Sequence, residues 1–73
     1  MYKVTVCDYK SGQMETLRFY HYRSCVRMAT VWQKRYWTNS VEVFSADHDD
    51  KVIYFMGSDT VGETTIERIT QEN

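Results

Sequence analysis

The sequence predicts a small α+β fold in which a sheet of antiparallel hairpins carries one helix on one face, in the order ββαββ. Hydrophobic residues recur with helical spacing in one stretch, between Tyr22 and Trp37. The segments on either side alternate polar and apolar residues, as half-buried strands do. The 73 residues include no proline and three scattered glycines. No linker is therefore visible, and residues 1–73 are predicted to form a single domain.

The predicted helix has an apolar side and a basic side. Steps of roughly 100° around the axis gather an apolar stripe of Tyr22, Cys25, Ala29, Trp32 and Tyr36, flanked by Val26 and Met28. The opposite side collects Arg23, Arg27, Thr30 and Lys34. His21 or Ser24 is expected to cap the start of the helix. Asn39 is expected to end it, because Asn tolerates the left-handed conformation.

The first hairpin is predicted with a turn centred on Ser11 and Gly12, where Gly12 supplies a positive φ. This turn pairs Val6 with Leu17 and Val4 with Phe19, and it directs these four side chains toward the helix. The other face then carries Lys3, Thr5, Cys7, Thr16, Arg18 and Tyr20.

The second hairpin combines Val41–Phe44 with Val52–Met56. Val41 and Val43 are expected to face the helix, whereas Phe44 points away. Because residues 52–56 are apolar at every position, periodicity leaves the orientation of the second strand open. If Ile53 and Phe55 join the core, the outward side chains are those of Val52, Tyr54 and Met56.

The C-terminal segment after Gly57 contains β-prone residues between positions 64 and 70. They favour a short fifth strand, although Ile66 and Ile69 are spaced as on a helix. The position of this segment matters for function, because Val61 or Ile66 is also a candidate to cover the outer face of the sheet.

If that face stays uncovered, several large apolar groups lie exposed on it, which usually marks an interface. The predicted partner-binding residues are Arg18, Tyr20, Phe44, Tyr54 and Met56. An alternative site for nucleic acid is the basic helix face, made of Arg23, Arg27, Lys34 and Arg35. A sequence pI near 6.0 departs from the strongly basic domains typical of nucleic-acid binding.

Charge is distributed unevenly along the chain. Residues 1–37 hold seven Lys or Arg against two Asp or Glu, whereas residues 38–73 hold two against eight, and the net charge is −1. This polarity can steer a charged partner. Alternatively, the two halves neutralise each other in the folded chain.

Metal and catalytic signatures are weak. Cys7, His21, Cys25 and His48 lack the paired spacing of a zinc site. The acidic segment Asp47–Asp50 lacks the twelve-residue calcium pattern. No nucleophile with a base, no oxyanion donor and no glycine-rich phosphate loop can be identified. The sequence therefore predicts a protein that is not an enzyme and holds no cofactor or metal.

The first residues alternate polar and apolar types and contain no continuous apolar run, which argues against a secretion signal or a membrane span. Two cysteines are too few for a secreted disulfide framework. A soluble, cytoplasmic protein is therefore expected.

Together these features predict a non-enzymatic protein-binding module that docks on a host protein or on a second copy of itself, as a homodimer. In size and in its content of Tyr, Trp and Met, the chain is similar to short accessory proteins of phages and mobile elements, including inhibitors of host machinery. In a DNA-mimic version, the acidic second half occupies a basic groove of the partner. The alternative function is direct binding of nucleic acid through the basic helix face.

Overall fold

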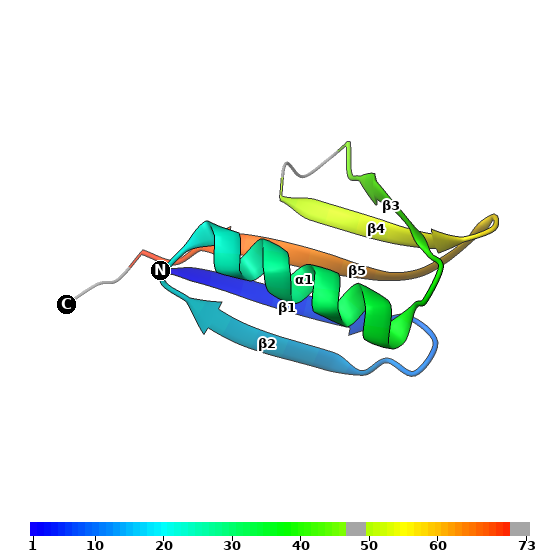
Figure 1. Ribbon diagram of the computed structural model, residues 1–73, viewed down its shortest axis with the longest axis horizontal. Helices are drawn as coiled ribbons and strands as arrows, with labels where there is room; N and C mark the ends of the chain where they lie inside the picture. The colour runs from blue at the N-terminus through cyan, green and yellow to red at the C-terminus, as the bar shows by residue number, and fades with distance from the viewer. Residues whose placement is uncertain (47–49, 71–73) are drawn as a thin grey trace.

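A computed structural model describes residues 1–46 and 50–70 and shows one sheet with one helix across it (Figure 1). Its elements are β1 (Tyr2–Asp8), β2 (Met14–Phe19), α1 (Tyr22–Tyr36), β3 (Val41–Phe44), β4 (Lys51–Met56) and β5 (Asp59–Arg68). The strands are ordered β2-β1-β5-β4-β3, and all neighbouring strands are antiparallel. The predicted α+β class, with its optional fifth strand, is confirmed.

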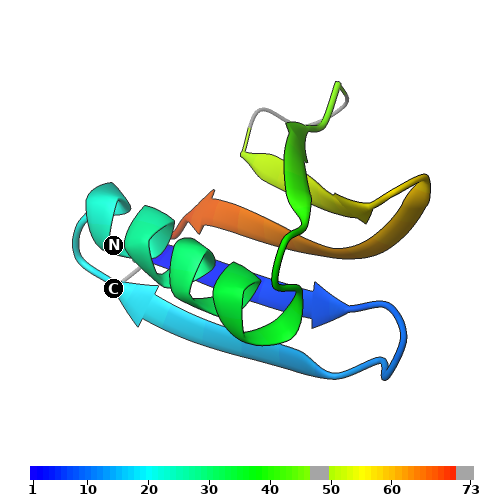
Figure 2. The same cartoon turned by 45° about the vertical axis from the view of Figure 1, so that its right-hand side comes forward.

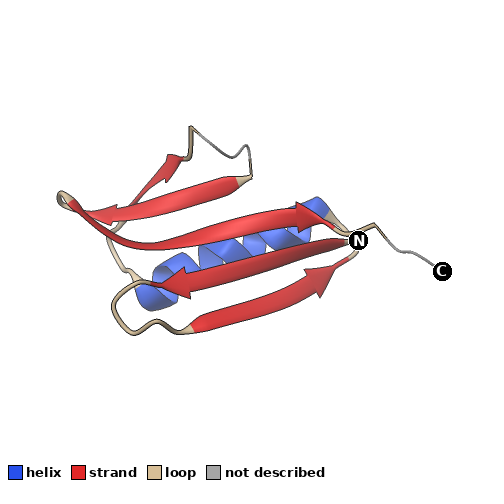
Figure 3. Cartoon of the chain, turned by 180° about the vertical axis from the view of Figure 1, so that it is seen from behind, coloured by secondary structure: helices blue, strands red, loops and turns tan. Residues whose placement is uncertain are grey.

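The fifth strand is longer and more central than the sequence indicated. β5 spans ten residues and lies between β1 and β4 (Figure 3). The β1-β2 hairpin and the β3-β4 hairpin are therefore joined through β5. The proposal that this segment covers the outer face of the sheet is wrong, because Ile66 is buried on the helix side as part of the core.

The predicted register of the first hairpin is wrong by two residues. Val4 pairs with Leu17, and Val6 pairs with Glu15. The cause is a longer loop built around Asp8, whose carboxylate accepts a hydrogen bond from the Ser11 hydroxyl at 2.7 Å. Gly12 has the expected positive φ of 75°. A shift of two keeps every side chain on its predicted face.

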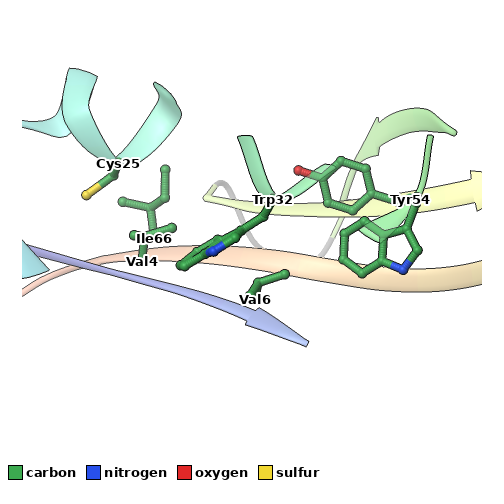
Figure 4. Packing of buried hydrophobic residues seen from close by; sticks show 7 residues of the cluster. Val4, Val6, Cys25, Trp32, Tyr54 and Ile66 are labelled. Atoms are coloured by element: carbon green, nitrogen blue, oxygen red, sulfur yellow. The ribbon is translucent and has the colours of Figure 1, made fainter. Parts of the chain in front are cut away.

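The core forms where α1 crosses β1, β2 and β5. Val4 and Val6 of β1 and Ile66 of β5 lie beneath Cys25 and Trp32 of the helix (Figure 4). The predicted burial of Cys25, Ala29 and Trp32 is confirmed. Other predicted core residues are not buried, namely Leu17, Val41 and Val43.

The helix ends where Trp37 turns back over the sheet. Asn39 adopts the expected left-handed conformation with φ of 69°, and His21 rather than Ser24 is the N-cap residue. The Trp37 ring stacks on Tyr54 with ring centres 4.8 Å apart. It also lies against Gly62, where a Cβ atom would overlap the indole. The chain can pass this point only because residue 62 has no side chain.

This packing fixes the orientation that periodicity left open. Tyr54 is 1% exposed, and its hydroxyl group shares a hydrogen bond of 3.0 Å with Thr64. Because strand residues alternate, Val52 and the cross-strand partners Glu42 and Phe44 also lie on the helix side. The predictions that Val41 and Val43 face the helix and that Tyr54 points outward are therefore wrong.

The face of the sheet opposite α1, here called the open face, is mainly polar over β2, β1 and β5. Lys3 forms an ion pair with Glu67 at 3.6 Å, and Lys51 forms one with Glu63 at 3.3 Å. Both pairs join a cation to a carboxylate of β5. Only the Lys3–Glu67 pair joins the basic first half of the chain to the acidic second half, so one contact among the described residues supports the interpretation that the two halves neutralise each other.

Candidate functional site

The helix covers only part of the sheet, and a groove remains beside it. α1 packs mainly on β1, β2 and β5, whereas β4 and β3 extend beyond it (Figure 2). Between the helix and these two strands lies a cavity of about 310 Å³. This cavity is here called the groove, and it is lined by Tyr22, Val26, Ala29, Thr30, Glu42, Phe44, Asp50, Val52, Tyr54, Thr64 and Ile66.

The groove presents apolar side chains to solvent from both walls. Val26 on the helix wall is 45% exposed, and Phe44 on the strand wall is 70% exposed. Buried Tyr54 and Ile66 contribute to its lining. A concave apolar surface with a few polar groups is the usual form of a binding site.

The strand wall is acidic. Glu42 projects from β3, and Asp50 immediately precedes β4. The Tyr22 hydroxyl group donates a hydrogen bond of 3.3 Å to the Asp50 carboxylate, which joins the two walls at one end. Burial and the neighbouring charge of Asp50 raise the pKa of Tyr22 above its ordinary value. Tyr22 therefore keeps its proton and acts as a donor at neutral pH.

The helix wall is bordered by basic residues on its solvent side. Arg27 and Lys34 lie three positions before and four positions after Thr30, so all three side chains are neighbours on the helix surface. Arg23 follows Tyr22 and lines a second hollow with Arg27 at the start of the helix. None of these three cations forms an ion pair with another residue in the described ranges. The groove thus has a basic border and an acidic border.

The outer edge of β3 also carries backbone hydrogen-bonding groups that β4 does not pair. The Ser45 N–H donates to the Lys51 carbonyl group at 2.9 Å, which places the bonded pairs of β3 and β4 at every second residue. The backbone groups of Glu42 and Phe44 consequently point away from β4. β3 is the last strand of the sheet over residues 1–46 and 50–70.

The structure does not bring the five predicted partner-binding residues together. Arg18 lies opposite Lys3 on the open face of β2, whereas Phe44 lies on the helix side of β3, at the other edge of the sheet. Tyr54 is buried. Tyr20 is exposed after β2, and Met56 is exposed at the end of β4.

Sequence reasoning missed the groove because it assigned Val26 to the border of the core and Phe44 to the outer face. The alternative nucleic-acid residues Arg23, Arg27, Lys34 and Arg35 remain on the exposed surface of α1. The groove could have been inferred by comparing the width of one helix with the width of the predicted sheet. One helix spans about 10 Å of sheet surface, or two strand spacings, so a five-stranded sheet leaves part of that side uncovered.

The candidate metal ligands are not assembled. Cys25 is in the core, and burial raises the pKa of its thiol. Cys7 alternates with Val6 and lies on the open face. No group of three His, Cys, Asp or Glu side chains suited to a metal occurs among the described residues. Asp47, His48 and Asp49 fall outside the described ranges.

Comparison with protein-family models, with curated proteins and with solved structures finds no match for this chain. Within the part of the chain that the structure describes, α1 is too short and too polar to cross a membrane.

Proposed function

We propose that this chain is a non-enzymatic protein-binding module that docks its partner in the groove between α1 and the β3-β4 hairpin. The single observation that supports it is the exposure of Val26 and Phe44 on facing walls of one apolar cavity. Folding alone would favour covering these groups. Large apolar side chains gathered at a concave surface usually mark a site where another molecule binds.

Two matched pairs of variants test the proposal. Val26 and Val31 are both on α1 and are 45% and 46% exposed, but only Val26 lines the groove. Phe44 and Val43 are neighbours on β3, but Val43 lies on the open face. Val26→Asp and Phe44→Asp therefore alter the groove, whereas Val31→Asp and Val43→Asp make similar changes elsewhere.

The measurement is affinity capture from a lysate of the native host with all four variants and the unaltered chain, followed by titration of the purified candidate. A groove partner binds the unaltered chain, Val31→Asp and Val43→Asp equally. It loses at least about tenfold in affinity with Val26→Asp or Phe44→Asp, as expected for an apolar contact at the centre of an interface. Equal affinity for all five proteins would overturn the proposal.

The alternative of nucleic-acid binding is tested with Val26→Asp and one further variant, Arg27→Glu. Fluorescence anisotropy with single-stranded and double-stranded oligonucleotides at low salt would detect contacts of Arg23, Arg27, Lys34 and Arg35 with phosphates. Our proposal predicts no binding. Affinity that falls with salt and with Arg27→Glu, but not with Val26→Asp, would favour the nucleic-acid alternative.

Two more specific versions of this protein-binding function can be distinguished. A host-protein inhibitor from a phage or mobile element would use the groove against one defined target. A DNA mimic would instead present acidic residues of the second half, and its binding would weaken steeply with salt. Glu63 and Glu67 are already engaged with Lys51 and Lys3, which leaves fewer carboxylates for mimicry. The groove version is therefore the better supported of the two.

A further inference from the structure

We infer that the groove receives one amphipathic helix of a partner protein, laid alongside α1 on the uncovered part of the sheet. This inference rests on the proposed function and specifies the chemistry of the partner. The occupant carries an apolar stripe toward β4, carboxylates along the flank that meets α1, and basic groups along the flank that meets β3.

The spacing of the sheet provides room for a helix. α1 lies over β1 and its neighbours, and β4 is two strands away from β1 in the order β1-β5-β4. Strands lie about 4.8 Å apart, so β4 is roughly 10 Å from β1. Packed helices lie 8–10 Å apart. A second helix at normal packing distance from α1 would therefore lie directly above β4.

The length of the groove sets the number of contacts. Its helix wall extends from Tyr22 to Thr30, which is about 12 Å at a rise of 1.5 Å per residue. Tyr22 is joined to Asp50 across one end of the groove, so the part of the helix wall that is open to a partner helix extends from Val26 to Thr30 and matches about one turn. The apolar stripe of such a helix would pack between Val26 on the helix wall and the cross-strand pair Val52 and Phe44 on the strand wall, as in other helix-in-groove complexes.

The charges on the two borders favour a helix with opposite charges on its two flanks. Arg23, Arg27 and Lys34 border the helix wall without ion pairs among the described residues. Glu42 and Asp50 lie on the strand wall. A uniformly basic helix would be repelled by the first border, and a uniformly acidic one by the second. The other available mode, an extended strand added at the edge of β3, would leave the basic border without a partner.

The experiment is selection from a phage-displayed library of random 16-residue peptides on the unaltered protein, with removal of peptides that also bind Val26→Asp. Selected peptides are synthesised and titrated. We expect apolar residues with helical spacing, carboxylates on one flank and basic residues on the other, and helical circular dichroism that increases on binding. Val31→Asp should bind them unchanged. Arg27→Glu should weaken binding about three- to tenfold at low salt and less at high salt.

The outcomes separate the two proposals. Peptides that depend on Val26 but alternate apolar and polar residues, as strands do, overturn the helix inference and leave the groove as the docking site. Failure to select any peptide that depends on Val26 also overturns the helix inference. Loss of the native partner with Val26→Asp would still support the proposed function in either case. A native partner indifferent to Val26→Asp and Phe44→Asp overturns both.

Discussion

The helix side of the sheet consists of two halves that differ in the exposure of their side chains. Beneath α1, the side chains of Val4, Val6 and Ile66 are almost completely buried. Beyond α1, Phe44 on the same side of the same sheet is 70% exposed. Both halves carry large apolar side chains, although the second half also carries Glu42. The difference is the presence of a covering helix: the first half contributes to stability, whereas Phe44 in the second half remains exposed at the groove, where we propose that a partner binds.

The largest effect should come from Trp32 in the covered half. Trp32 is fully buried against the core. Trp32→Ala is expected to cost about 3–5 kcal/mol, the usual range for a buried large aromatic residue. Because a domain of this size has only a few kcal/mol of net stability, the variant should lose cooperative unfolding in urea.

Val31→Ala on the same helix is the control, because Val31 is half exposed. It should change the free energy of unfolding by about 0.5 kcal/mol or less. A Trp32→Ala protein that unfolds at the same urea concentration as the control would contradict the assignment of the core.

The next effect lies at the boundary between the halves, where Trp37 crosses β5. A Cβ atom at residue 62 would overlap the Trp37 ring and approach the Cys7 carbonyl oxygen to 2.6 Å. Gly62→Ala is therefore expected to destabilise the fold by about 1–3 kcal/mol, as overpacked sites do. Thermal unfolding followed by circular dichroism measures this loss, and an unchanged melting temperature would show that Trp37 is not held against β5.

The packing at this boundary also separates the features that the sequence predicts from those that it does not. The helix, its core residues and the fold class follow from periodicity, because Cys25, Ala29 and Trp32 lie on one helical stripe. Which side chains of the β3-β4 hairpin point toward the helix does not follow from periodicity, because residues 52–56 are apolar at every position. Their orientation is decided by the stacking of Trp37 on Tyr54 over Gly62, between residues that are distant in the sequence.

The unequal sizes of helix and sheet indicate that part of the helix side is uncovered, but for the same reason they do not indicate which side chains lie there. Once Tyr54 points inward, Phe44 must lie on the helix side, and the expected aromatic surface is divided.

The predicted register of the first hairpin was wrong for a local reason. The Asp8 side chain organises a loop that strand pairing alone does not specify. Asp8 also accepts a hydrogen bond from the Trp37 indole at 3.1 Å, so this loop and the boundary are connected. The hydrogen bonds from Ser11 and Trp37 lower the pKa of Asp8.

A smaller effect is expected from the hydroxyl group of Tyr54. Tyr54→Phe removes the hydrogen-bond partner of Thr64, which is itself buried. The expected loss is about 1 kcal/mol in the free energy of unfolding. Tyr20→Phe is the matched control, because Tyr20 is largely exposed and should show almost no change. Equal urea midpoints for the two variants would place the Tyr54 hydroxyl group in contact with water.

The smallest effect on stability is expected in the uncovered half, and it provides the most direct test of the comparison. Phe44→Thr keeps a residue suited to strands and removes little buried surface, so it should change the free energy of unfolding by about 0.5 kcal/mol or less. Phe19→Thr, at a partly buried residue packed against the core, should cost at least about 1.5 kcal/mol. Urea unfolding of both variants measures the difference. If Phe44→Thr proves as costly as Phe19→Thr, Phe44 stabilises the fold, and its exposure no longer argues for a docking site.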